Sequence, residues 1–196
     1  MPALALACVL SLSLAGSCSS TRSELGGTVY VHPLADISSF ERIAILPLEN
    51  LSPERFAGQR VREVLAVELA AMGLFEVIDA GQVNSALARR SLVDMTMLEP
   101  ALLSDLAAEL DVQGILMGSV LELGTQRTST FQAPEVSLSL RLIEAQSGIV
   151  AWSVTDARRG LAMETRLFGV GEKTQTEVVR ELVRTLMTDL YQAAGS

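Results

Sequence analysis

Few side chains in this sequence are able to do chemistry, and those few are poorly placed for it. The 196 residues include two cysteines, Cys8 and Cys18, and one histidine, His32. A thiol can act as a nucleophile, a metal ligand or a point of covalent attachment, whereas a histidine is the usual base of a hydrolytic triad. Because His32 stands alone beside Pro33 and no cysteine or histidine pair has metal-ligand spacing, the sequence predicts no catalytic residue and no metal site.

The segment GVGEKT, residues 169–174, is the nearest approach to a phosphate-binding loop. A P-loop needs a glycine directly before its lysine, so that backbone amides can surround the phosphates. Here Glu172 precedes Lys173 and adds negative charge where a phosphate would sit. We therefore interpret the segment as a loop before a capped helix, and expect no cofactor; a nucleotide-dependent enzyme that uses Lys173 is the alternative.

The first seventeen residues have the composition of an export signal. Residues 3–16, ALALACVLSLSLAG, are uncharged and apolar. This run is too short to span a membrane, which takes about twenty residues, and is typical of the hydrophobic region of a signal peptide. We expect residues 1–17, including Cys8, to be removed; a buried N-terminal helix is the alternative.

The residues before Cys18 resemble a bacterial lipobox. LAGS, residues 14–17, precedes the cysteine, and in this family of signals cleavage falls just before the cysteine, which then receives a diacylglycerol and an acyl chain such as palmitate. The resemblance predicts that Cys18 is the lipidation site and that the lipid anchors the protein to a membrane, since each buried methylene contributes about 0.8 kcal/mol. By resemblance to enterobacterial sorting signals, Ser19 in place of Asp favours the outer membrane, with the domain facing the periplasm.

Composition favours one globular domain behind a tether. Half of the residues, 49%, are hydrophobic and 19% are charged, which is enough apolar material for one core. Residues 18–40 mix Ser, Gly, Pro and charges, as a tether does, although TVYV before Pro33 can pair as an edge strand. Residues 41–196 are expected to form the domain. The net charge of −8 and the scattered arginines exclude a nucleic-acid surface.

The first half of the domain is predicted to alternate strands and helices. The continuous apolar run of residues 43–46 suits a strand that is covered on both faces. Apolar residues at three- and four-residue spacing predict a helix over 53–72. A short strand follows at 75–79, and two further helices begin at Asp79 and Pro100.

The second half is predicted to be a strand meander closed by a helix. Residues 112–123 form the first strand and 135–142, which alternate strictly, form a one-sided antiparallel strand. In the third strand, from Val150 to Val154, Trp152 and both valines should share a face. The final helix begins at a capping box after residue 173. The predicted class is α/β (α+β), with helices packed on a mixed sheet of about five strands in the order β-α-β-α-α-β-β-β-α.

Several segments, taken in this order, resemble the CsgG-like group of envelope lipoproteins, whose fold is similar to the N-terminal domain of TolB. These segments are RIAILPLENLS, GLFEVID, DVQGILMGSVLELG and SLSLRLIEAQSGIVAWS, and the resemblance covers about residues 41–190. The group includes the curli channel CsgG, the exopolysaccharide-export lipoprotein PelC and LpoB-type activators of peptidoglycan synthases. The resemblance implies a periplasmic domain that is not an enzyme and that assembles or regulates envelope machinery.

The expected function is therefore that of an outer-membrane lipoprotein serving as an assembly or scaffold component of a secretion or export machine. Its partners would be the membrane, further copies of itself as a homo-oligomer, and other envelope and secretion proteins. The alternative is a monomeric activator of a peptidoglycan synthase. Trp152 is the candidate interface residue, because large aromatic side chains dominate interface energetics.

Overall fold

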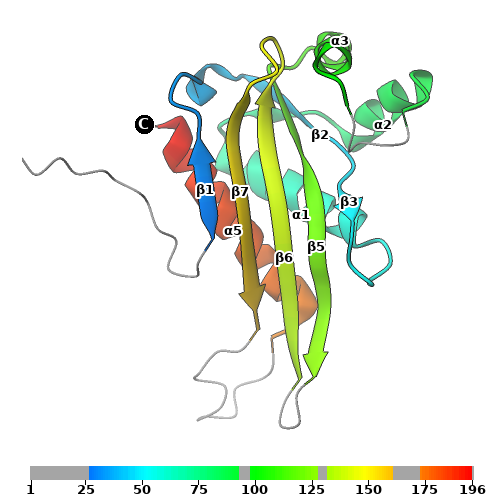
Figure 1. Cartoon of the computed structure of the whole chain (residues 1–196), viewed down its shortest axis with the longest axis vertical. Coiled ribbons are helices and arrows are strands. Elements are labelled where there is room, and N and C mark those ends of the chain that lie inside the picture. Colours follow the sequence, from blue (N-terminus) through cyan, green and yellow to red (C-terminus); the bar gives the residue numbers. More distant parts are fainter. Residues whose placement is uncertain (1–26, 93–97, 128–131, 161–172, 196) are drawn as a thin grey trace, which may run out of the picture.

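The computed structural model describes residues 27–92, 98–127, 132–160 and 173–195. Within these residues the chain forms four long helices, one short 3-10 helix and the strands of a single mixed sheet (Figure 1). In chain order the elements are β1 (Thr28–Val31), η1 (Ile37–Ser39), β2 (Arg42–Ile45), β3 (Glu49–Asn50), α1 (Ala57–Met72), β4 (Glu76–Val77), α2 (Ala80–Arg89), α3 (Pro100–Leu110), β5 (Gly114–Arg127), β6 (Gln132–Glu144), β7 (Val150–Arg159) and α5 (Gln175–Ala194).

The described strands lie in the order β1-β7-β6-β5-β2-β4, and β3 also pairs with β5. β2, β3 and β4 are parallel to their neighbours, and the consecutive strands β5, β6 and β7 form an antiparallel meander. β1 pairs antiparallel with β7 at the edge of the sheet. β2 and β3 both pair with β5, with Pro47 between them. The predicted class, a mixed sheet with helices packed on it, is confirmed. TVYV forms the edge strand β1, as its sequence allowed, and β3 is an additional strand.

Helices cover the two faces of the sheet unequally. Ile43 and Ile45 of β2 belong to a large core with α1 and α5, and the intervening Ala44 belongs to a second core with α2 and α3. Because successive strand residues point to opposite faces, the two helix pairs lie on opposite sides of the sheet. In Figure 1, α1 and α5 run behind the long strands, and α2 and α3 lie near the upper end of the sheet.

Periodicity correctly predicted the four long helices. α1 ends at Gly73, whose φ of +67° is the left-handed conformation expected at such a cap. Asp79 caps α2, Pro100 opens α3, and Thr174 caps α5 through a complete capping box with Glu177. The predicted start of the first helix at Pro53 was wrong, because α1 begins only at Ala57, after a turn.

Two local features differ from the sequence predictions. Val150 does not share a face with Trp152: the pairs Leu142–Trp152 and Ile143–Val150 are adjacent on β6, which leaves Ala151 as an extra residue in a β-bulge. Val150 consequently packs against the second core. Residues 28–40, assigned to the tether, contain β1 and η1, and Ile37 and Phe40 are buried in the first core, so this part of the segment packs on the domain.

Candidate binding groove

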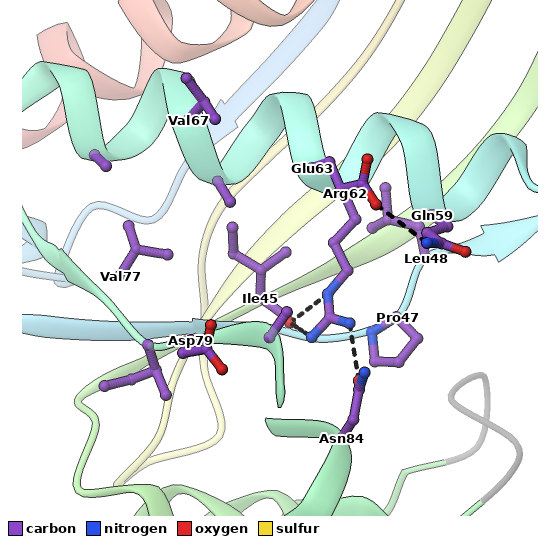
Figure 2. Close-up of a pocket in the computed structure, with 14 residues that line it drawn as sticks. Ile45, Pro47, Leu48, Gln59, Arg62, Glu63, Val67, Val77, Asp79 and Asn84 are labelled. Carbon is purple, nitrogen blue, oxygen red and sulfur yellow. Dashed lines mark hydrogen bonds between the residues drawn. The ribbon is translucent and has the colours of Figure 1, made fainter. Parts of the chain in front are cut away.

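A groove lies between α1 and the start of α2 (Figure 2). Its volume is about 910 Å³. Ala66, Val67 and Ala70 of α1 form one wall, and Val77 and Ile78 lie opposite them. Val67 is 67% exposed, so this wall presents apolar surface directly to solvent.

A buried arginine lies in the lining of the groove. Arg62 is 8% exposed, and its Nε and Nη2 donate hydrogen bonds of 3.0 and 2.6 Å to the carbonyl oxygen of Ile45. Its Nη1 donates to Oδ1 of Asn84 on α2 at 2.9 Å (Figure 2). The guanidinium thus links α1, the end of β2 and α2.

The shortness of β4 explains why Arg62 is needed. β4 ends at Val77, and the next amide, Ile78 N, donates to the carbonyl of Ile43 at 3.0 Å. The following β2 carbonyl on this edge belongs to Ile45, where β4 has already turned away. A buried carbonyl without a donor is costly, and Arg62 provides that donor in place of a longer strand.

The charge of Arg62 is only weakly balanced. Within the described residues, no carboxylate oxygen lies within 4 Å of its nitrogens, and its three bonds go to neutral acceptors. Burial lowers the pKa of Arg62, and the charge of Asp79 raises it by a smaller amount. Arginine nevertheless stays protonated near neutral pH. Asp79 itself accepts from the amides of Gly81 and Gln82 at the start of α2.

The lining of the groove combines apolar walls with a few polar side chains. Glu63 accepts a hydrogen bond of 3.1 Å from Gln59 at the rim, and the rest of the lining is largely apolar. No nucleophile with an adjacent base lies among its lining residues. Sequence reasoning missed this groove. Arg62 precedes Leu65 and Leu69 by three and seven residues, so helical spacing placed it on the buried stripe, and that was the available signal.

The structure places Trp152 in the core. Its side chain is 0% exposed in the single chain and belongs to the core that α1 and α5 cover. Its indole Nε1 has no hydrogen-bond partner within the described part of the chain. A side chain with no accessible surface cannot contact a partner while the domain keeps this fold, so the structure does not favour Trp152 as an interface residue.

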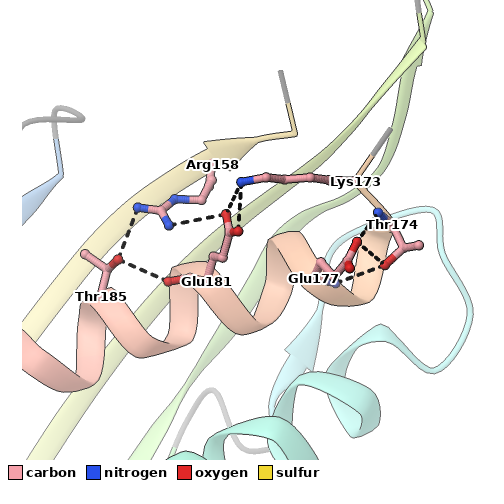
Figure 3. Close-up of polar contacts among 6 residues, drawn as sticks. All are labelled: Arg158, Lys173, Thr174, Glu177, Glu181 and Thr185. Carbon is pink, nitrogen blue, oxygen red and sulfur yellow. Dashed lines mark hydrogen bonds and ion pairs between the residues drawn. The ribbon is translucent and has the colours of Figure 1, made fainter. Parts of the chain in front are cut away.

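Lys173 is held by the carboxylate of Glu181, as Figure 3 shows. Its Nζ lies 2.7 and 2.8 Å from the two carboxylate oxygens of Glu181, and Arg158 lies 3.7 Å from the same group. Glu177 accepts from the Thr174 amide at 2.7 Å, and this hydrogen bond is the main cause that lowers the pKa of Glu177. These contacts fit the predicted capped helix start, while residues 169–172 lie outside the described residues.

The remaining residues considered in the sequence analysis are His32 and the two cysteines, and no functional site is seen at them in the described part of the chain. His32 is partly buried, and its Nδ1 accepts from the Leu34 amide at 3.2 Å. Cys8 and Cys18 lie outside the described residues. Among the residues with described positions, no three His, Cys, Asp or Glu side chains cluster closely enough to hold a metal ion. None of the described helices is long and apolar enough to cross a membrane.

Comparison with known families identifies the domain. The model of the family described as "Peptidoglycan-synthase activator LpoB" matches residues 27–157, well over half of the chain. The chain belongs to the LpoB family. The match begins at the residue before β1, in agreement with the pairing of β1 with β7. The search of curated proteins found no match.

Solved structures share the fold of this LpoB-family chain. PelC from Paraburkholderia phytofirmans, a dodecamer, is 18% identical, with a TM-score of 0.56 over 83% of this chain and 96% of that one. Lipoprotein GNA1162 from Neisseria meningitidis is 18% identical, with a TM-score of 0.56 over 78% of this chain and 99% of that one. Such low identities show the fold alone. The expected resemblance to LpoB and PelC is confirmed, and the CsgG-like name is not supported.

Proposed function

We propose that this protein is a membrane-tethered activator of a peptidoglycan synthase and that it acts by binding. The family match over residues 27–157 carries this proposal. The described groove and ion pairs agree with a binding protein, since they bring together no nucleophile and base. Activation of a synthase is the alternative function in the sequence analysis. Because of the family match, we now prefer it to the export scaffold.

The proposed attachment is through Cys18. After removal of residues 1–17, the nine residues 18–26 would separate the lipid from the folded chain at Gly27. A fully extended segment of this length spans at most about 30 Å. The domain would therefore work close to the periplasmic face of the outer membrane, and its partner would have to reach it there.

Activation is tested with the purified lipoprotein and the peptidoglycan synthase of the same organism. We expect the two proteins to co-purify, and the rate of glycan-strand synthesis to rise severalfold when the lipoprotein is added. A rate that stays unchanged at saturating lipoprotein, together with no co-purification, would contradict the proposed function. Heat-denatured lipoprotein is the control for effects of added protein and detergent.

Cys18→Ser is expected to move the protein from the membrane fraction to the soluble fraction. The substitution removes the thiol that would carry the lipid, and with it an anchoring energy of about 0.8 kcal/mol per buried methylene. Cell fractionation and intact-mass measurement report the result. Cys8→Ser is the matched control, because Cys8 would leave with the signal peptide. Unchanged membrane attachment of the Cys18 variant would mean that a partner retains the protein.

A homo-oligomeric scaffold in an envelope export machine is the second candidate function. Its support is the fold shared with PelC, whose solved structure is a dodecamer. Native mass spectrometry of residues 19–196 would show whether the protein is a homo-oligomer or a monomer. A strictly monomeric protein at high concentration would count against the scaffold and would leave the synthase activator unaffected.

A further inference from the structure

The loop between β3 and α1 presents two large apolar side chains to solvent. Leu51 is 57% exposed and Phe56 is 66% exposed. The intervening residues, SPER, form a turn before the first residue of α1. In Figure 1 this cyan loop projects from the side of the sheet that holds β3, far from β1.

The loop is held in place by several hydrogen bonds. Asn50 donates to the carbonyl of Glu54 at 2.9 Å and accepts from the amide and the hydroxyl of Ser52 at 3.0 and 2.7 Å. The Leu51 amide donates to Val120 of β5 at 2.9 Å, and Glu54 pairs with Arg60 at 3.4 Å. The exposure of Leu51 and Phe56 is therefore a feature of an organised surface, which favours binding because little ordering remains to be done.

Phe56 is an unfavourable choice for the fold at its position. Its φ of +62° and ψ of +16° lie in the left-handed region, which glycine adopts freely and a bulky side chain adopts at a cost. It is also the N-cap of α1, where Ser, Thr, Asp or Asn would accept a helix amide and Phe makes no side-chain cap bond. Strained residues that persist without a benefit to folding are found at functional sites.

The charge beside the ring indicates the chemistry of its partner. The guanidinium carbon of Arg55 lies 5.5 Å from the centre of the Phe56 ring. In the described structure Arg55 has no carboxylate within 4 Å, whereas the neighbouring Glu54 is already paired with Arg60. An exposed aromatic ring with an unpaired cation next to it fits an apolar pocket that has carboxylates on its rim.

We propose that Phe56 is the anchor by which this protein docks on its synthase, with the ring in an apolar pocket and Arg55 paired with acidic groups around it. This inference rests on the proposed function. A protein partner is favoured over the bilayer because the tether joins the fold at Gly27, beside β1. β3 lies four strand spacings from β1, about 19 Å across the sheet, so the loop is on the far side of the sheet from the point where the tether joins it.

The test is Phe56→Gly, assayed for both stability and synthase binding. Glycine relieves the left-handed strain, so the Tm should equal or exceed that of the unmodified protein. Removal of the ring should weaken binding to the purified synthase at least tenfold, measured by titration calorimetry. Phe56→Tyr keeps the ring and should retain the affinity. Arg55→Glu should also weaken binding, with a loss that shrinks as salt is added.

Ser91→Gly is the matched control for strain relief. Ser91 is exposed, has a φ of +55° and lies at the end of α2, outside the loop. Its replacement should raise or preserve the Tm and leave the affinity for the synthase unchanged. A fall in affinity equal to that of Phe56→Gly would show that rigidity of the whole domain, rather than the ring, governs binding.

The outcomes separate the two proposals. If the unmodified protein does not bind the synthase, the proposed function fails. If it binds and Phe56→Gly binds equally well, the anchor is wrong while the function stands. Two further outcomes, each with synthase affinity unchanged, would assign the ring to another partner. If Phe56→Gly loses self-association in native mass spectrometry, the ring binds a second copy. If it loses binding to vesicles of phosphatidylethanolamine and phosphatidylglycerol, the ring binds the bilayer. A lowered Tm would overturn the strain argument.

Discussion

Replacing Trp152 with alanine should lower the free energy of unfolding by about 3–5 kcal/mol. The indole is 0% exposed and packs in the core shared by the long strands, α1 and α5. Its register partner on β6, Leu142, is also fully buried, so little can move to fill the space. A cavity therefore adds to the loss of buried apolar surface. Urea denaturation followed by circular dichroism measures the change.

Two variants make this result specific. Trp152→Phe keeps most of the packing and removes an indole N–H that has no partner within the described residues, so its loss should stay below about 1.5 kcal/mol. Tyr191→Ala, at an aromatic residue that is 53% exposed, should change stability by less than about 0.5 kcal/mol. A Trp152→Ala protein with unchanged stability but altered association would restore the interface hypothesis.

Arg62→Met should lower the free energy of unfolding by about 1–3 kcal/mol. Methionine resembles the arginine stem in volume but donates no hydrogen bond, so the carbonyl of Ile45 would lose both of its arginine donors. Asn84 would lose its contact with α1, and the link between α1, β2 and α2 would be broken. Part of the cost is offset because a buried and weakly balanced charge is also removed. The measurement is again urea denaturation.

Glu63→Gln is the control for Arg62→Met, since it alters the adjacent rim residue without touching the β2 carbonyl. Its effect should be within about 0.5 kcal/mol. Arg62→Lys should fall between the two, because an ammonium can donate to Ile45 but lacks the planar fork that also reaches Asn84. Equal stability of Arg62→Met and the unmodified protein would show that water in the groove satisfies the Ile45 carbonyl.

Much of the fold could be predicted from local patterns. A helix buries a stripe at every third or fourth residue, and α5 buries such a stripe: Val178, Val179, Leu182, Val183, Leu186, Met187 and Leu190. Caps depend on neighbouring residues, so Asp79 and the capping box at Thr174 marked helix starts correctly. Strict alternation likewise identified the buried face of β6.

Non-local contacts decided what these patterns could not show. β3 has only two residues, and it is a strand because β5 is long enough to pair with it beyond β2. The bulge at Ala151 changes the facing of Val150, since register depends on the partner strand. The sequence could not show whether Trp152 lies in the core or at an interface, because an apolar side chain can be buried by its own domain or by a partner.

The sequence by itself determined that this protein has one mixed sheet with helices on it, and it predicted a lipid attachment at Cys18 and the lack of a catalytic set. The fold class and the lack of a catalytic set were inferred from composition and short-range spacing, and the lipid attachment from the resemblance to a lipobox. Only the tertiary structure showed that Arg62 completes the edge of β2 and that Phe56 is exposed in a strained conformation. The reason is physical: a carbonyl left without a strand partner, and a ring left without a core, arise only when distant segments have packed together.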